Sequence, residues 1–177
     1  MRALLGRDSR HRFDAHWETR MSATFDRLKD LGLVLPPAAA PVANYVPFKR
    51  AGNLVVVSGQ LCFGPDGQLD SRHKGKVGAE VSPEAATEAA RFCALNVLAQ
   101  LQAAVGNLDD AVVSCIRLGG FINTAPGFSA VAGVMNGASD LMVQVLGERG
   151  RHARSTVGVA ELPLDAVVEV EGMFEVR

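Results

Sequence analysis

An arginine and three glutamates lie in two strand-like segments near the C-terminus. Side chains of these types, at this spacing, could bind a charged ligand or pair with one another. Side chains alternate across a strand, so each segment divides into two faces. In the first segment we expect the core face to comprise Ser155, Val157 and Val159, with Arg154 on the opposite face. In the second, the carboxylates alternate with apolar residues: Glu169, Glu171 and Glu175. A guanidinium can bind a carboxylate through two parallel hydrogen bonds, so these segments could form ion pairs or hold an acidic group.

The two segments are predicted to form a hairpin through the connection 161–165, and two registers match their apolar faces. In one register Arg154 opposes Glu171, and in the other it opposes Met173. Either register places Arg154 on the same helix-free face as the glutamates. An exposed cross-strand ion pair, worth ~0.2 to 1 kcal/mol, is one explanation. Burial of this face against another subunit is the other, since small and apolar residues lie among its charges.

The elements that must position these residues follow the order ββαβαββ. Strands are predicted at 45–48 and 54–61, joined by a turn, and at 112–122. Ser82 and Pro83 mark the start of a helix that runs to about Val105 and stops at Gly106.

A second helix is expected over 138–146, capped by Asn136 or Ser139, before the final hairpin. This order predicts an α+β sandwich with two helices on one face of a mixed sheet.

Bulk properties narrow the classes of function. The chain has 177 residues, a formal net charge of -1 and 48% hydrophobic residues, which is typical of one globular domain. No basic and aromatic surface pattern is evident, so nucleic acid is a poor fit as partner. Three scattered cysteines favour neither disulfides nor a metal site, and no apolar stretch approaches the length of a membrane helix. We expect a cytoplasmic protein with a small or acidic metabolite as partner.

The N-terminal part differs from the rest. Residues 1–20 are rich in arginine and are interpreted as a divergent extension, with either a translational start at Met21 or an ordered appendage before it. Residues 21–39 are expected to form a short helix and a proline-containing linker, and residues 40–177 the main domain.

Three segments in order resemble the Rid (YjgF, reactive-intermediate deaminase) family, also called endoribonuclease L-PSP. They are residues 57–60 (VSGQ), 153–163 (ARSTVGVAELP) and 168–171 (VEVE), and the resemblance covers about residues 40–177. It implies a chorismate-mutase-like subunit that assembles as a homotrimer, with active sites in the clefts between subunits. It also implies hydrolysis of enamines and imines to 2-keto acids and ammonia, without metal or organic cofactor.

The resemblance assigns roles to individual residues. Arg154 matches the arginine that binds the substrate carboxylate, and Glu169 the glutamate that orients water. The matched substrate-binding residues are Tyr45, Ser58, Gly59, Asn136 and Thr156. Tyr45 could equally pack at an interface, and Asn136 could equally cap a turn or helix. His152 is interpreted as a surface residue, and Glu171 as structural.

The sequence also departs from the compact family pattern. It has longer loops at 70–79 and 121–138, and Thr156 replaces a common cysteine. Imine deaminase activity, which the resemblance implies, is the leading hypothesis. A non-catalytic module that binds a small acid is the second, and an endoribonuclease or translation inhibitor the third.

Overall fold

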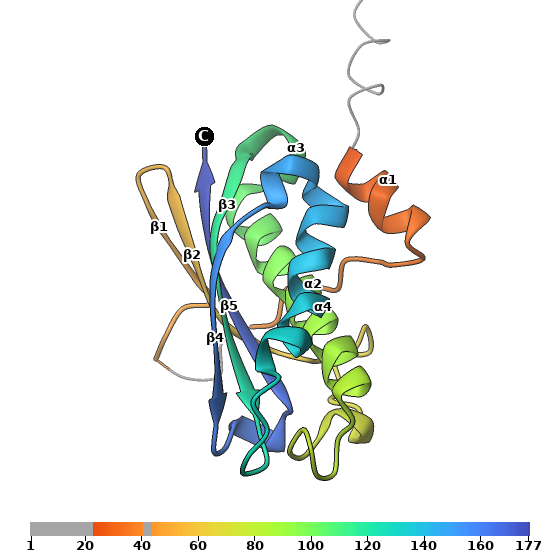
Figure 1. Ribbon diagram of the computed structural model, residues 1–177. Helices are drawn as coiled ribbons and strands as arrows, with labels where there is room; N and C mark the ends of the chain where they lie inside the picture. Colours follow the sequence, from red (N-terminus) through yellow and green to blue (C-terminus); the bar gives the residue numbers. More distant parts are fainter. Residues whose placement is uncertain (1–22, 41–43) are drawn as a thin grey trace, which may run out of the picture.

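A five-stranded mixed sheet with its helices on one face forms the body of the protein (Figure 1). The computed structural model describes residues 23–40 and 44–177. The expectations for the N-terminal extension and for a start at Met21 lie outside the described residues, as does the linker segment 41–43. The strand order is β1-β2-β5-β3-β4, and all neighbours are antiparallel except β3 and β4.

The element order confirms the predicted ββαβαββ succession. The strands are β1 (Phe48–Ala51), β2 (Leu54–Leu61), β3 (Val112–Asn123), β4 (Ala153–Val159) and β5 (Val168–Val176). The helices are α1 (Ala23–Asp30), α2 (Pro83–Val105), α3 (Leu108–Ala111) and α4 (Val131–Leu146). Short 3₁₀ turns lie at Ser71–His73, Gly147–Gly150 and Pro163–Asp165. In the described part of the chain, no helix is long and apolar enough to cross a membrane.

Helix α2 begins and ends where the sequence predicts. The Ser82 hydroxyl accepts a hydrogen bond from the Ala85 N–H at 3.2 Å, and Pro83 occupies the first turn. Gly106 ends the helix with φ +82° and donates its N–H to the Gln102 carbonyl. Both signals act within a few residues, and the sequence alone therefore locates this helix.

Helix α4 begins at Val131, so the expected start near residue 138 is wrong, as is the expected cap. Ala130 is the N-cap, and Asn136 lies inside the helix. Gly137 lets α4 approach α2 closely, because a Cβ there would lie 2.0 Å from the Thr87 carbonyl oxygen. Glycine destabilises a helix in isolation. Here the close packing of α4 against α2 offsets that destabilisation.

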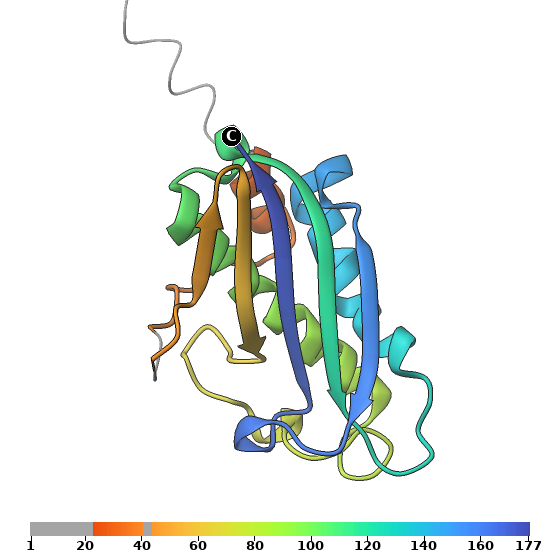
Figure 2. The ribbon, with the colours of Figure 1, turned by 90° about the vertical axis from the view of Figure 1, so that its left-hand side faces the viewer.

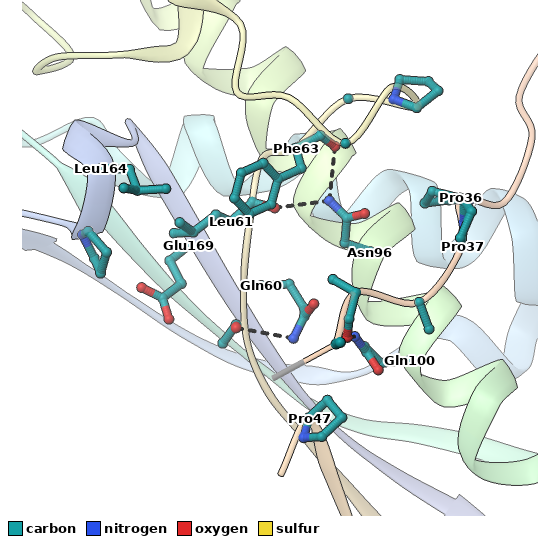
Figure 3. A pocket seen from close by; sticks show the side chains of 18 of the residues that line it. Pro36, Pro37, Pro47, Gln60, Leu61, Phe63, Asn96, Gln100, Leu164 and Glu169 are labelled. Carbon is teal, nitrogen blue, oxygen red and sulfur yellow. Dashed lines mark hydrogen bonds between the residues drawn. The ribbon is translucent and has the colours of Figure 1, made fainter. Parts of the chain in front are cut away.

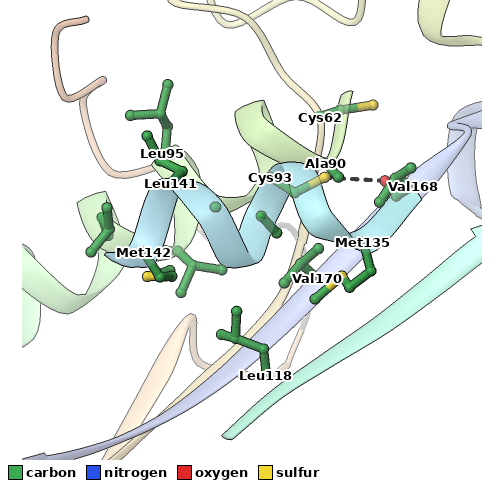
Figure 4. Packing of buried hydrophobic residues seen from close by; sticks show 14 of the residues in the cluster. Cys62, Ala90, Cys93, Leu95, Leu118, Met135, Leu141, Met142, Val168 and Val170 are labelled. Carbon is green, nitrogen blue, oxygen red and sulfur yellow. Dashed lines mark hydrogen bonds between the residues drawn. The ribbon is translucent and has the colours of Figure 1, made fainter. Parts of the chain in front are cut away.

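The hydrophobic core lies between the sheet and the α2/α4 pair (Figure 4). It includes Leu98, Leu141 and Met142 from the helices and Val170 and Phe174 from β5. Figure 4 shows Leu141 and Met142 of α4 together with Val170 of β5. As expected, all three cysteines are free and buried: Cys62, Cys93 and Cys115. Burial raises the pKa of the Cys115 thiol to about 12, so this thiol stays protonated.

The expected final hairpin is wrong, because β3 lies between β4 and β5. Strand β4 pairs with β3 in parallel, Leu118 facing Arg154, while β5 pairs with β3 antiparallel, Leu118 facing Gly172. The connection 160–167 therefore crosses from one side of β3 to the other, past a 3₁₀ turn in which Leu164 and Asp165 have positive φ. Figure 2 shows the bare face of this sheet with the helices behind it.

Candidate functional site

Arg154 and the glutamates lie on opposite faces of the sheet, which corrects the sequence expectation. The pairing partner of Arg154 is Leu118, a fully buried residue that faces the helices. Residues paired side by side project to the same face. Arg154 accordingly contacts α4, whereas Glu169 and Glu171 alternate with buried residues of β5 and project to the helix-free face. The face assignment of β4 is thus reversed, and Ser155 and Val157 lie on the helix-free side.

The carboxylate of Glu169 lies against Gly59 at an irregular step in β2. The β2–β5 register shifts between Val57 and Gln60, and the pairing skips Ser58 and Gly59. A Cβ at Gly59 would lie 1.8 Å from Glu169 Oε1, so only glycine leaves room for the carboxylate here. Ser58 holds the preceding segment in place, since its backbone N–H and its hydroxyl donate to the carbonyls of Pro47 and Val46.

Burial raises the pKa of the half-buried Glu169 carboxyl, and the negative charge of Glu171 raises it further. Glu171 lies over Gly119 in the same manner and pairs with Arg117, with 3.0 Å between its Oε1 and the arginine Nη1. A carboxyl with a raised pKa is a stronger base than an ordinary carboxylate, and it can return the proton that it accepts. Glu169 is therefore the residue of this face best suited to acid–base chemistry.

Glu169 borders a cavity of about 750 Å³ at the end of β2 (Figure 3). Tyr45 and Gly59 line the same cavity, and the tyrosine side chain is 53% exposed. The remaining wall comes from the segment 36–40, Pro47, Gln60, Leu61, the segment 63–67, Asn96 and Gln100 of α2, Pro163 and Leu164. Its size is typical of small-molecule sites.

A second group of candidate residues surrounds Arg154 on the α4 side of the sheet. The guanidinium donates to the Ser139 hydroxyl at 3.0 Å and to the Ala132 carbonyl at 3.1 Å. Nδ1 of His152 lies 2.6 Å from the Gly150 carbonyl, which assigns the ring proton to Nδ1. Its Nε2 then accepts the hydroxyl proton of Ser139 at 3.0 Å, leaving the serine oxygen free to accept from Arg154. His152 thus orients Ser139, and Ser139 holds Arg154.

Thr156 and Asn136 lie on the same side as Arg154. Thr156 follows Arg154 two residues along the strand, and its hydroxyl is buried with no hydrogen-bond partner among the described residues. Asn136 is exposed and lies one helical turn after Ala132 and three residues before Ser139, which Arg154 contacts. Its side chain is available to a ligand and caps no helix.

The sequence-derived residues therefore form two half-sites in one chain. We call Glu169, Tyr45, Ser58 and Gly59 the carboxylate half-site. We call Arg154, Thr156 and Asn136 the arginine half-site. Sequence reasoning missed Ser139 as an arginine partner and Asn96 and Gln100 as cavity residues, because each acts through a contact with a distant segment. The described residues include no cluster of three or more acidic, histidine or cysteine side chains suited to a metal ion.

Comparison with known sequences shows the family of this chain. Residues 25–176 match the profile of the YjgF/chorismate mutase-like endoribonuclease family. The chain belongs to this family. The predicted resemblance and the predicted chorismate-mutase-like fold are both confirmed.

Two relatives are each 45% identical to this YjgF-family chain over the aligned residues. Protein TCP17 of Trypanosoma cruzi is 45% identical over 151 residues, covering 85% of this chain and 92% of TCP17. The crystal structure of Atu1372 from Agrobacterium tumefaciens, a protein of unknown function, is also 45% identical. It superposes with a TM-score of 0.80 over 87% of this chain and 92% of Atu1372.

A more distant relative contains a ligand. TdcF of Escherichia coli, crystallised with bound serine, is 25% identical and superposes with a TM-score of 0.55. The match covers 81% of this chain and 94% of TdcF.

Proposed function

We propose that this protein hydrolyses carboxylate-bearing imines to 2-keto acids and ammonia at sites formed between two copies of the chain. The observation that carries the proposal is Glu169, a half-buried carboxyl with a raised pKa at the edge of a ligand-sized cavity. Arg154 of a second copy would bind the substrate carboxylate. The homotrimer implied by the family is the assembly we propose.

Two copies are needed because one chain cannot bring the half-sites together. Arg154 and Glu169 project from opposite faces of the sheet, and β3 separates their strands. The arginine half-site lies on edge strand β4, where it is open to a neighbour. The helix-free face carries exposed Val56 and Val157, which favours its burial against another subunit.

The proposed reaction uses Glu169 as both base and acid. Glu169 accepts a proton from a water molecule as the water oxygen attacks the imine carbon, and it passes this proton to the nitrogen to give the carbinolamine. Glu169 then accepts the proton of the carbinolamine hydroxyl and delivers it to the nitrogen, so that the carbon–oxygen double bond forms as the carbon–nitrogen bond breaks and ammonia leaves. The raised pKa of Glu169 suits both transfers, because it makes the carboxylate a stronger base.

Arg154 is suited to fix the substrate because its guanidinium is already oriented by Ser139 and Ala132. Its remaining N–H groups can bind a carboxylate in bidentate fashion, which a lysine ammonium cannot reproduce. Thr156 lies two residues along the same side of β4, and its buried hydroxyl would reach the same ligand only after a local rearrangement. TdcF with bound serine supports this assignment, since serine carries the carboxylate and nitrogen of such substrates.

The decisive experiment measures hydrolysis of 2-iminopropanoate and of 2-imino-4-methylpentanoate, both made in situ from amino acids by an oxidase. We expect the wild-type protein to accelerate at least one reaction and Arg154→Ala and Glu169→Gln to abolish the acceleration. Retained keto acid binding without acceleration of any imine would instead favour the small-acid-binding module. RNA cleavage that survives Arg154→Ala would favour the endoribonuclease.

A further inference from the structure

The cavity beside Glu169 extends well beyond the residues needed for imine hydrolysis. Figure 3 shows Glu169 on one side and Pro36 and Pro37 on the other, with Gln60 between them. A volume of about 750 Å³ is far larger than the carboxylate and imine carbon of a substrate require. The extra space therefore lies next to the proposed reaction centre.

The wall of this extra space is apolar. It is formed by prolines, alanines and larger apolar side chains: Pro36, Pro37, Ala38, Ala39, Ala40 and Phe63. We call the segment Pro36–Ala40 the proline wall. It precedes strand β1 in the sequence, and its residues are brought to the cavity only by folding.

Two amides on α2 fix this wall and the opposite side of the cavity. Gln100 is 2% exposed and donates from Nε2 to the Ala39 carbonyl at 2.7 Å. One turn earlier, Asn96 donates from Nδ2 to the carbonyls of Leu61 and Phe63, both at 3.0 Å. Because one helix positions both sides, the cavity is formed before a ligand enters.

The side-chain amide nitrogens that border the cavity are engaged by the protein itself. The donors of Asn96 and Gln100 bind backbone carbonyls, and Gln60 donates from Nε2 to the carbonyls of Ser58 and Gly59. Asp66 is exposed and accepts the Gln68 N–H at 3.0 Å. The proline wall and Phe63 present apolar surface, so a ligand group that packs against them is best accommodated when it is apolar as well.

We infer that the proline wall selects substrates with a large apolar side chain, such as the imine of leucine, over the imine of alanine. This inference rests on the proposed function, because it uses Glu169 to place the reacting carbon. The substrate side chain would extend from Glu169 along Gln60 towards Ala38 and Ala39. Each additional buried methylene can change kcat/KM by about 10-fold or more.

The test compares kcat/KM for 2-imino-4-methylpentanoate and 2-iminopropanoate in wild-type and variant proteins. The wild-type ratio is expected to exceed about 10. Ala38→Trp, which fills the space, and Gln100→Leu, which releases the wall, should each lower that ratio about tenfold while activity on the small imine remains. Ala103→Trp and Gln102→Leu, on α2 but outside the cavity, are the matched controls and should keep the wild-type ratio.

The outcomes separate this inference from the proposed function. Equal kcat/KM on both imines, or a ratio unchanged in both cavity variants, overturns the inference and leaves the deaminase proposal standing. If no imine is hydrolysed, the proposed function fails, and binding of 4-methyl-2-oxopentanoate and pyruvate is compared by calorimetry. Tighter binding of the larger keto acid, lost in Ala38→Trp, supports the apolar site. Equal binding of both acids overturns it.

Discussion

Mixing two inactive variants should restore activity if each site takes residues from two copies. In Arg154→Ala the carboxylate half-site is intact, and in Glu169→Gln the arginine half-site is intact. Each variant alone lacks one of the two residues in every copy, so it cannot complete a site. Because the two residues lie on opposite faces of one sheet, the two intact residues must come from different copies. When equal amounts assort at random into one closed assembly, about a quarter of the sites combine two intact halves. The mixture should therefore recover about a quarter of the wild-type rate per chain.

The assay requires real exchange of subunits. The two proteins are unfolded together in denaturant, refolded and compared with each variant refolded alone, and native mass spectrometry counts the mixed assemblies. A mixture of two copies of the same variant is the matched control and should stay inactive. If mixed assemblies form in the expected proportion and no activity returns, Arg154 and Glu169 do not serve one intersubunit site. Activity in either variant alone would contradict the roles given to these residues.

Three further changes test the half-sites. Gly59→Ala should lower kcat about 100-fold with little change in melting temperature, because the new Cβ displaces the Glu169 carboxylate and not the backbone; steady-state kinetics and thermal melting by circular dichroism check this. Glu171→Gln should move the acidic limb of the kcat/KM profile to lower pH. The loss of its charge lowers the pKa of Glu169, which must be ionised to accept a proton, and a limb that stays in place contradicts the charge effect. Ser139→Ala should raise KM about 2- to 10-fold and leave kcat unchanged, since Arg154 loses one oriented hydrogen bond at an exposed position. An unchanged KM would show that the serine does not orient the arginine.

The fold could be predicted where its signals are local. Ser82, Pro83 and Gly106 bound α2 because each acts on backbone groups within one turn. The start of α4 could not be predicted, because Gly137 weakens the helical pattern and its reason for being there is Thr87, on another helix. The connection between β4 and β5 is short enough for a hairpin loop, so the sequence predicts that the two strands pair. In the structure β3 lies between them, an arrangement that depends on packing across the whole sheet.

The candidate site was predictable as a set of residues and not as an arrangement. Alternation along the strand correctly placed Arg154 on the face opposite to its neighbours in β4. The side of the sheet to which that face belongs was inferred from a direct pairing of β4 with β5, which does not occur. The rule that opposed residues project to the same face applies only to strands that are hydrogen-bonded to each other. The contact between Gln100 and Ala39 joins residues 61 positions apart, and no local pattern reports it.

Tyr45 gives the protein a built-in reporter. It is the one tyrosine in the sequence, and its ring lines the cavity beside Glu169 while remaining half exposed. In a sample labelled only with isotopically enriched tyrosine, the ring signals in an NMR spectrum would come from this position alone. Entry of a ligand into the cavity can thus be followed by titration, without mutation and without any turnover of substrate.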